Sequence, residues 1–112
     1  MKIVEIRNME TVQTPHSVDV RKLYDKDSAQ VMHITLRPGE SLKPHITPVD
    51  VFFFVLEGAP HVLVGDEKIQ VHSNSLIESP KDIVHCLYNE TSTICRILVV
   101  KAPKPQTQAR LL

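Results

Sequence analysis

Short stretches of β-branched, aromatic and aliphatic residues recur along the chain, and turn-forming residues interrupt them about every ten residues. This rhythm is typical of an all-β barrel or sandwich, and no segment carries the apolar period of a helix. The expected strands cover residues 2–7, 18–24, 30–37, 51–57, 61–64, 68–72, 75–78, 84–88 and 93–101. The three glycines, Gly39, Gly58 and Gly65, each fall at a break, where a positive φ is commonly required.

The chain has 112 residues, enough for one hydrophobic core but too few for two domains. We expect one barrel domain over residues 1–101. Residues 102–112 lose the strand alternation and gain proline and polar residues, which predicts a flexible C-terminal tail.

Thirteen basic residues balance thirteen acidic ones, so no net field attracts nucleic acid, and we expect none as a partner. The longest apolar run, residues 51–56, is far shorter than the roughly 20 residues of a membrane helix, so no membrane partner is expected either. The N-terminus is too polar for a signal peptide, which favours a soluble cytoplasmic protein. Cys86 and Cys95 are then expected to stay reduced, although their two adjacent candidate strands would also allow a disulfide.

Residues 51–56 hold all three phenylalanines and do not alternate between apolar and polar positions. A strand of this kind is apolar on both faces, and only one face can meet the core of the same barrel. The other face needs cover from a second sheet or another subunit, because an exposed apolar strand invites aggregation. We therefore expect a homodimer.

Two motifs separated by a short segment resemble the conserved motifs of the cupin family. In residues 39–58, Gly39, His45 and Gly58 fit the first cupin motif in register, together with its Val-Leu-Glu-Gly ending. Residues 80–89 fit the second motif through its proline, histidine and asparagine, with Asp82 in place of the glycine. The resemblance implies a cupin jelly-roll barrel, or double-stranded β-helix, with its pocket inside the barrel.

Family members commonly bind Mn, Fe, Ni, Zn or Cu in that pocket through three histidines and a glutamate. The implied ligand positions in this chain are His45, Thr47, Val51 and His85. Thr47 has only a neutral hydroxyl and Val51 has no donor atom, so His45 and His85 alone are expected to hold a divalent metal (Zn, Mn, Fe or Ni) weakly or not at all.

Three residues are candidates for a third ligand. Asp50 stands one residue before the expected glutamate, and a β-bulge after Pro48 would turn it inward. His61 and His33 lie on expected strands, although neither belongs to a motif. His16 and His72 are expected to be solvent-facing loop residues, since nothing with metal-ligand spacing surrounds them.

These residues support three hypotheses. The first is a small-molecule-binding cupin with a degenerate metal site, whose mostly apolar pocket suits a carboxylate or carbonyl ligand. The second is a metal-dependent enzyme of the oxygenase or isomerase kind that uses His45, His85 and one of the three further ligands. The third is a binding or assembly module with a vestigial pocket. The residues expected to line the pocket are His45, Thr47, Val51, Phe53, Val55, His85 and Leu87.

Overall fold

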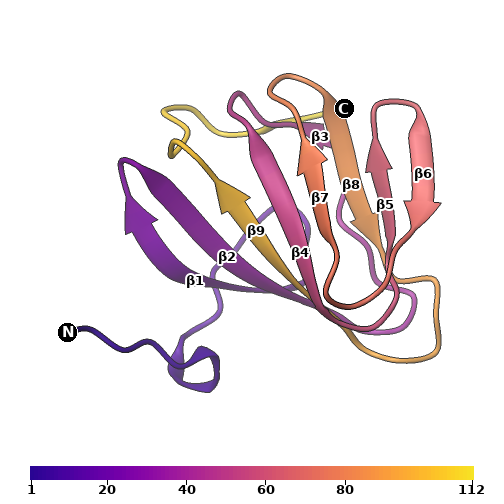
Figure 1. Ribbon diagram of the computed structural model, residues 1–112, viewed down its shortest axis with the longest axis horizontal. Coiled ribbons are helices and arrows are strands. Elements are labelled where there is room, and N and C mark those ends of the chain that lie inside the picture. Colours follow the sequence, from indigo (N-terminus) through magenta and orange to yellow (C-terminus); the bar gives the residue numbers. More distant parts are fainter.

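A computed structural model describes residues 1–112, in which the chain forms two five-stranded antiparallel sheets and no α-helix. The first sheet has the order β1-β2-β9-β4-β7, with bounds Asp19–Lys26, Ala29–Leu36, Cys95–Lys101, Val51–Glu57 and Leu76–Ser79. The second has the order β10-β3-β8-β5-β6, with bounds Arg110–Leu111, His45–Ile46, Val84–Tyr88, His61–Val64 and Glu67–Gln70. Figure 1 shows the two sheets lying against each other as the walls of a barrel. The expected all-β jelly roll is confirmed.

The core fills the closed part of the space between the sheets. Along β4, Val51, Phe53 and Val55 are buried, while the residues between them are only partly covered. Strand β9 alternates in the same way, with Cys95, Ile97 and Val99 buried. Successive side chains of a strand point to opposite faces, so these buried sets define the inner face of the first sheet.

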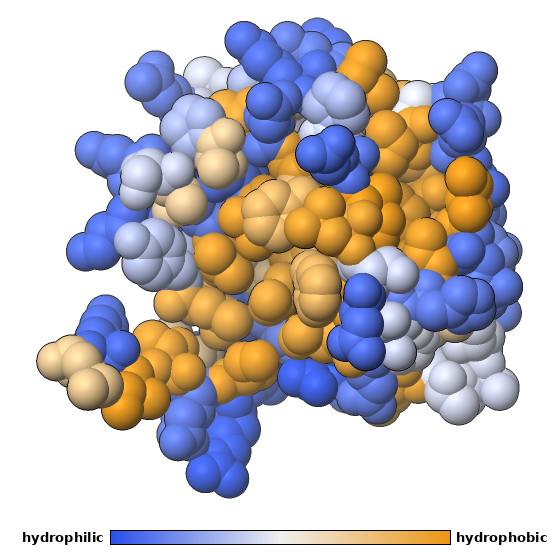
Figure 2. Space-filling model, in the orientation of Figure 1, coloured by the Kyte–Doolittle hydropathy of each residue, from blue (hydrophilic) through white to orange (hydrophobic).

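The outer face of the first sheet is also apolar. Phe52 lies opposite Val100, and Phe54 lies between Leu98 and Leu76. These side chains are only partly buried or exposed. In Figure 2, apolar residues form a continuous orange area across the centre of the face that carries β9, β4 and β7 in Figure 1.

The two ends of the chain differ from the sequence-based expectation. Residues 2–7 were expected to form a strand, which is wrong: no strand pairs with them, and a 3₁₀ turn, η1, covers Ile6–Asn8. Residues 2–7 have no neighbouring strand whose backbone groups could pair with theirs, so the apolar alternation alone does not produce a strand. At the other end, Arg110–Leu111 forms β10, which pairs with β3, and the Leu112 N–H donates to the Pro44 carbonyl over 3.2 Å. No helix in the structure is long and apolar enough to cross a bilayer.

Two tight positions shape the loops beside the sheets. Gly58 follows the last residue of β4 and has φ 86°, and a Cβ there would lie 2.6 Å from the Ile94 carbonyl oxygen and 2.8 Å from Cys95 Sγ. Asp82 has φ 63°, so the position where the second cupin motif has glycine keeps the left-handed backbone conformation that glycine favours. Its N–H donates to the Thr47 carbonyl over 3.0 Å, which fixes the approach to β8 next to the end of β3.

Candidate functional site

A cavity of about 470 Å³ lies between the two sheets, within the size range of small-molecule sites. Its walls come from both sheets, from residues 13–16 of the N-terminal segment and from the C-terminal tail. The residues that line it are Gln13, Thr14, Pro15, His16, Val20, Gln30, Met32, Ile34, Leu42, His45, Phe53, His85, Val99, Lys101, Pro105, Gln106, Thr107, Gln108, Ala109 and Leu111. The tail that was expected to be flexible therefore forms part of the cavity wall.

His45 and His85 meet at this cavity because β3 and β8 pair in a register that sets them opposite each other. Their Nε2 atoms lie 3.1 Å apart, and both residues are buried. His45 Nδ1 lies 2.7 Å from the Lys43 carbonyl, which can only accept, so this nitrogen carries a proton. In the neutral pair, His85 Nε2 therefore donates to His45 Nε2.

Two hydroxyl groups and a phenyl ring contact the imidazole of His85. With its proton on Nε2, His85 has a bare Nδ1, which accepts from the Ser79 hydroxyl over 2.6 Å. Thr47 Oγ1 lies 3.0 Å from His85 Nε2. Phe53 contacts the same imidazole edge-on, with ring centroids 5.2 Å apart. These contacts fix the orientation of His85 at the cavity wall.

Burial and neighbouring positive charges keep these imidazoles neutral. Burial, with smaller contributions from His45, Lys101 and His16, lowers the pKa of His85 to about 3. Burial also lowers the pKa of His45, and Lys101 contributes in the same direction, against the opposing effect of the Lys43 carbonyl. At neutral pH the pair acts as a network of hydrogen-bond donors and acceptors without formal charge.

His16 joins the pair, although it was expected to face solvent. Its ring centroid lies 4.7 Å from that of His45, and the Lys43 backbone N–H donates to its Nδ1 over 2.8 Å. Burial, followed by the charges of His45, Lys43 and Lys101, lowers its pKa to about 4. The segment that carries His16 has no strand or motif signal, so sequence periodicity offered no way to place it.

The residues expected to line the pocket divide into three groups. His45, Phe53 and His85 line the cavity. Thr47 is buried behind His85, as its hydrogen bond shows. The remaining expected residues are buried and are not among those that line the cavity: Val51, Val55 and Leu87.

The structure places two of the three proposed third ligands outside the cavity. Asp50 is exposed, and its Oδ1 accepts the Lys81 backbone N–H over 2.8 Å. His33 lies on β2 between two cavity-lining residues, so it points to the opposite face of the sheet. There its Nε2 accepts from Arg96 Nε over 3.2 Å.

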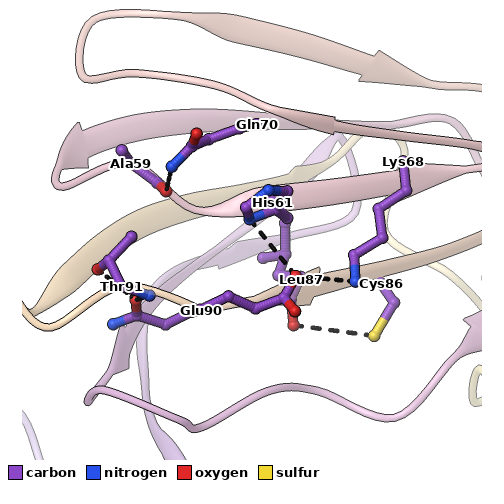
Figure 3. Close-up of polar contacts among 9 residues, drawn as sticks. Ala59, His61, Lys68, Gln70, Cys86, Leu87, Glu90 and Thr91 are labelled. Carbon is purple, nitrogen blue, oxygen red and sulfur yellow. Dashed lines mark hydrogen bonds and ion pairs between the residues drawn. The ribbon is translucent and has the colours of Figure 1, made fainter.

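His61, the third of these candidates, does not line the cavity either and lies beside Glu90 and Lys68. It lies opposite Tyr88 on the β5–β8 pair, and its neighbour Val62 occupies the core. Figure 3 shows the Glu90 carboxylate between His61 and Lys68. The Glu90 Oε1 atom lies 3.5 Å from His61 Nδ1 and 2.8 Å from Lys68 Nζ.

The cavity does not fit the metal that the family commonly holds. No group of three or more His, Cys, Asp or Glu side chains is placed to hold a metal ion. Of the ligand positions that the family uses, two imidazoles and the neutral Thr47 hydroxyl remain, whereas catalytic zinc sites supply three protein ligands with an open position. His16 contacts His45 but does not complete a group of three such ligands. Lys101, which lines the same cavity, adds an ammonium group that opposes a divalent cation.

Two antiparallel sheets that enclose a histidine-bearing cavity define a double-stranded β-helix of the cupin type. The family model of the cupin domain matches residues 32–101. The chain belongs to the cupin family.

Similar proteins agree with this assignment. An uncharacterized protein of Methanocaldococcus jannaschii is 26% identical over 88 residues, which cover 78% of this chain and 76% of that protein. The crystal structure of that same protein, described as an RmlC-like cupin with a double-stranded β-helix fold, has a TM-score of 0.75 at 24% identity, covering 94% of this chain and 96% of that one. The polyketide cyclase RemF from Streptomyces resistomycificus has a TM-score of 0.85 at 24% identity, covering all of this chain and 85% of that one. These structures share the fold.

Proposed function

We propose that this cupin binds a small molecule in the cavity beside His45 and His85. The observation that carries the proposal is the cavity of about 470 Å³ whose wall combines apolar side chains with a buried, oriented histidine pair. Small-molecule sites commonly combine a mostly apolar lining with a few fixed polar groups that set the orientation of the ligand. Because burial lowers the pKa of both histidines, the pair presents neutral hydrogen-bonding groups to that ligand.

Ligand screening with a matched pair of variants tests this proposal. Saturation-transfer NMR with a fragment library identifies binders of the wild-type chain, and the same fragments are applied to His45→Leu and to His72→Leu. His45 lines the cavity, whereas His72 is exposed and outside it. We expect His45→Leu to lose the signal that His72→Leu keeps. Equal binding by both variants, with both folded, would place the site elsewhere and refute the proposal.

A metal-dependent enzyme of the oxygenase or isomerase kind is the alternative. One observation favours it: His45 Nε2 and Thr47 Oγ1 both lie within 3.1 Å of His85 Nε2, so three donor atoms gather at one point. Metal analysis of tag-free protein after incubation with Zn, Mn, Fe or Ni separates the two proposals. Stoichiometric metal that is lost in His85→Ala supports the alternative, and a metal-free, folded protein supports the metal-independent cupin.

We further propose that the chain works as a cytoplasmic homodimer. The partly covered outer face of β4 and β9, with Phe52, Phe54 and Leu98, supplies the apolar surface that a second copy would bury. Both cysteines are buried and unpaired, which is consistent with a reducing compartment.

A further inference from the structure

The cavity wall holds one ammonium group and no carboxylate. Lys101 at the end of β9 lines the cavity, and none of the other lining residues is aspartate or glutamate. Lys101 is partly buried and takes part in none of the ion pairs of the structure. A charged group that is removed from water is normally paired with an opposite charge. The Lys101 ammonium lacks such a partner within the protein.

The neighbours of Lys101 on both sides are uncharged. In the sheet register it lies opposite Val51 on β4 and opposite Gln30 on β2. The carboxylate nearest to it in the β4 segment, Asp50, accepts the Lys81 N–H and is exposed. The three histidines that line the cavity supply no counter-charge either, because an imidazole is neutral or positively charged and never negative.

Lys101 also stands beside a position that would normally bear charge. The family resemblance assigns Val51 to the glutamate ligand of the metal, and Val51 is the direct cross-strand partner of Lys101. The chain therefore lacks a carboxylate where cupins commonly have one and has an ammonium group next to it. The cavity is positively charged without a metal, and its natural counter-charge is an anion.

We infer that the ligand of the cavity is a small organic acid whose carboxylate pairs with Lys101, with its apolar body against the barrel wall. This inference rests on the proposed small-molecule function and names its ligand class. Met32, Ile34, Val99 and Phe53 supply the apolar wall. Charge-assisted hydrogen bonds between an ammonium and a carboxylate are about twice as strong as neutral ones, so Lys101 selects acids over their neutral isosteres.

The burial of Lys101 supports the same ligand class. Desolvation lowers the pKa of Lys101 below its ordinary value, which means that the charged form is held at a cost in the empty cavity. A bound carboxylate reverses this effect. His16 is one further donor for the second carboxylate oxygen, because its Nδ1 accepts from Lys43 and its proton is therefore on Nε2.

Pairs of acids and amides test the inference on the chain of 112 residues. Benzoate and hexanoate are compared with benzamide and hexanamide by isothermal titration at pH 7.5, for wild type, Lys101→Met, Lys101→Gln and the surface control Lys26→Met. Lys26 is exposed and lies outside the cavity. We expect the acids to bind wild type and Lys26→Met at least tenfold more tightly than the amides. Both Lys101 variants should lose this preference while circular dichroism shows an intact fold.

The outcomes separate this inference from the broader proposal. Equal binding of acid and amide, unchanged in the Lys101 variants, would overturn the acid specificity and leave a small-molecule cavity standing. Acid binding that survives in both folded Lys101 variants would overturn the role of Lys101. Absence of binding by every probe, together with a negative fragment screen, would overturn both proposals.

Discussion

Lys101 lies directly opposite Val51 across the β9–β4 pair, so an ammonium group faces the cavity next to an aliphatic side chain that offers it no counter-charge. This relationship links the stability of the barrel to its ligand. A group that is uncompensated in the empty protein lowers stability, and it contributes binding energy when a partner arrives.

The first prediction is that Lys101→Met stabilises the empty protein. Methionine keeps most of the length of the side chain and removes a charge that the barrel desolvates without pairing. We expect the melting temperature to rise by about 3–6 °C, the shift that corresponds to a free-energy gain near 1 kcal/mol in a domain of this size. Differential scanning calorimetry measures it, with Lys26→Met as control. A fall in melting temperature for Lys101→Met alone would show that the ammonium is satisfied in the empty protein.

The second prediction compares two glycines with the same backbone conformation. Gly39 has φ 85° with nothing within 4 Å of an added Cβ, whereas at Gly58 the Cβ would collide with the Ile94 carbonyl and Cys95 Sγ. Gly39→Ala should cost only the left-handed penalty of about 1–2 kcal/mol. Gly58→Ala should cost about 2 kcal/mol more through overpacking. Urea denaturation gives both values, and equal costs would mean that the loop at Ile94 moves away freely.

The third prediction concerns acid. The pKa of His85 is lowered to about 3 and that of His16 to about 4 in the folded protein, against about 6.5 in the unfolded chain. The unfolded chain therefore binds more protons between pH 6.5 and 4, and folding stability is complete above pH 6.5 and declines below it. We expect a loss of about 1 kcal/mol per pH unit for each histidine in this window.

Chemical denaturation at a series of pH values measures this decline. His16→Gln removes one of the histidines with a lowered pKa and should make the decline shallower, whereas Ser28→Ala, at an exposed turn, should leave it as in wild type. An unchanged slope in His16→Gln would mean that the pKa of His16 is the same in the folded and unfolded states.

The fourth prediction concerns the outer face of the first sheet. Phe54 lies on that face between Leu98 and Leu76, and a glutamate there would bury an unpaired charge in the proposed dimer interface. Sedimentation velocity should show a dimer for wild type and a monomer for Phe54→Glu. Ile69→Glu, at an exposed position of β6 in the other sheet, should remain dimeric. A wild-type chain that is monomeric at tens of micromolar would contradict the proposed dimer.

Turn residues and strand alternation predicted most of this fold. Gly39, Gly58 and Gly65 mark real breaks with positive φ, and the paired motifs predicted that His45 and His85 belong to one barrel. The strand predicted over residues 2–7 is absent, because alternation indicates amphipathic character and not the presence of a partner strand.

The candidate site was less accessible from sequence. His16 reaches the cavity through a loop whose path depends on tertiary contacts such as the Lys43 N–H bond. Lys101, in contrast, could have been found: Cys95, Ile97 and Val99 alternate inward along β9, and the next position in that series is Lys101. The C-terminal wall had no signal, since two paired residues in β10 are too few to produce a pattern.

That short pairing has a kinetic consequence. Residues of the tail cover the cavity, and Lys104 still bonds to Asp27 and Asp25. Beyond Lys104, the tail is tied to the barrel only through the pairing of Arg110 and Leu111 with β3 and one further bond from Leu112. So few bonds can open while the two sheets stay intact, since local opening needs far less free energy than global unfolding. The rate at which a ligand leaves would then be set by how often the β10–β3 pairing opens. Substitutions in the last three residues would change the residence time of the ligand while its contacts inside the barrel stay the same.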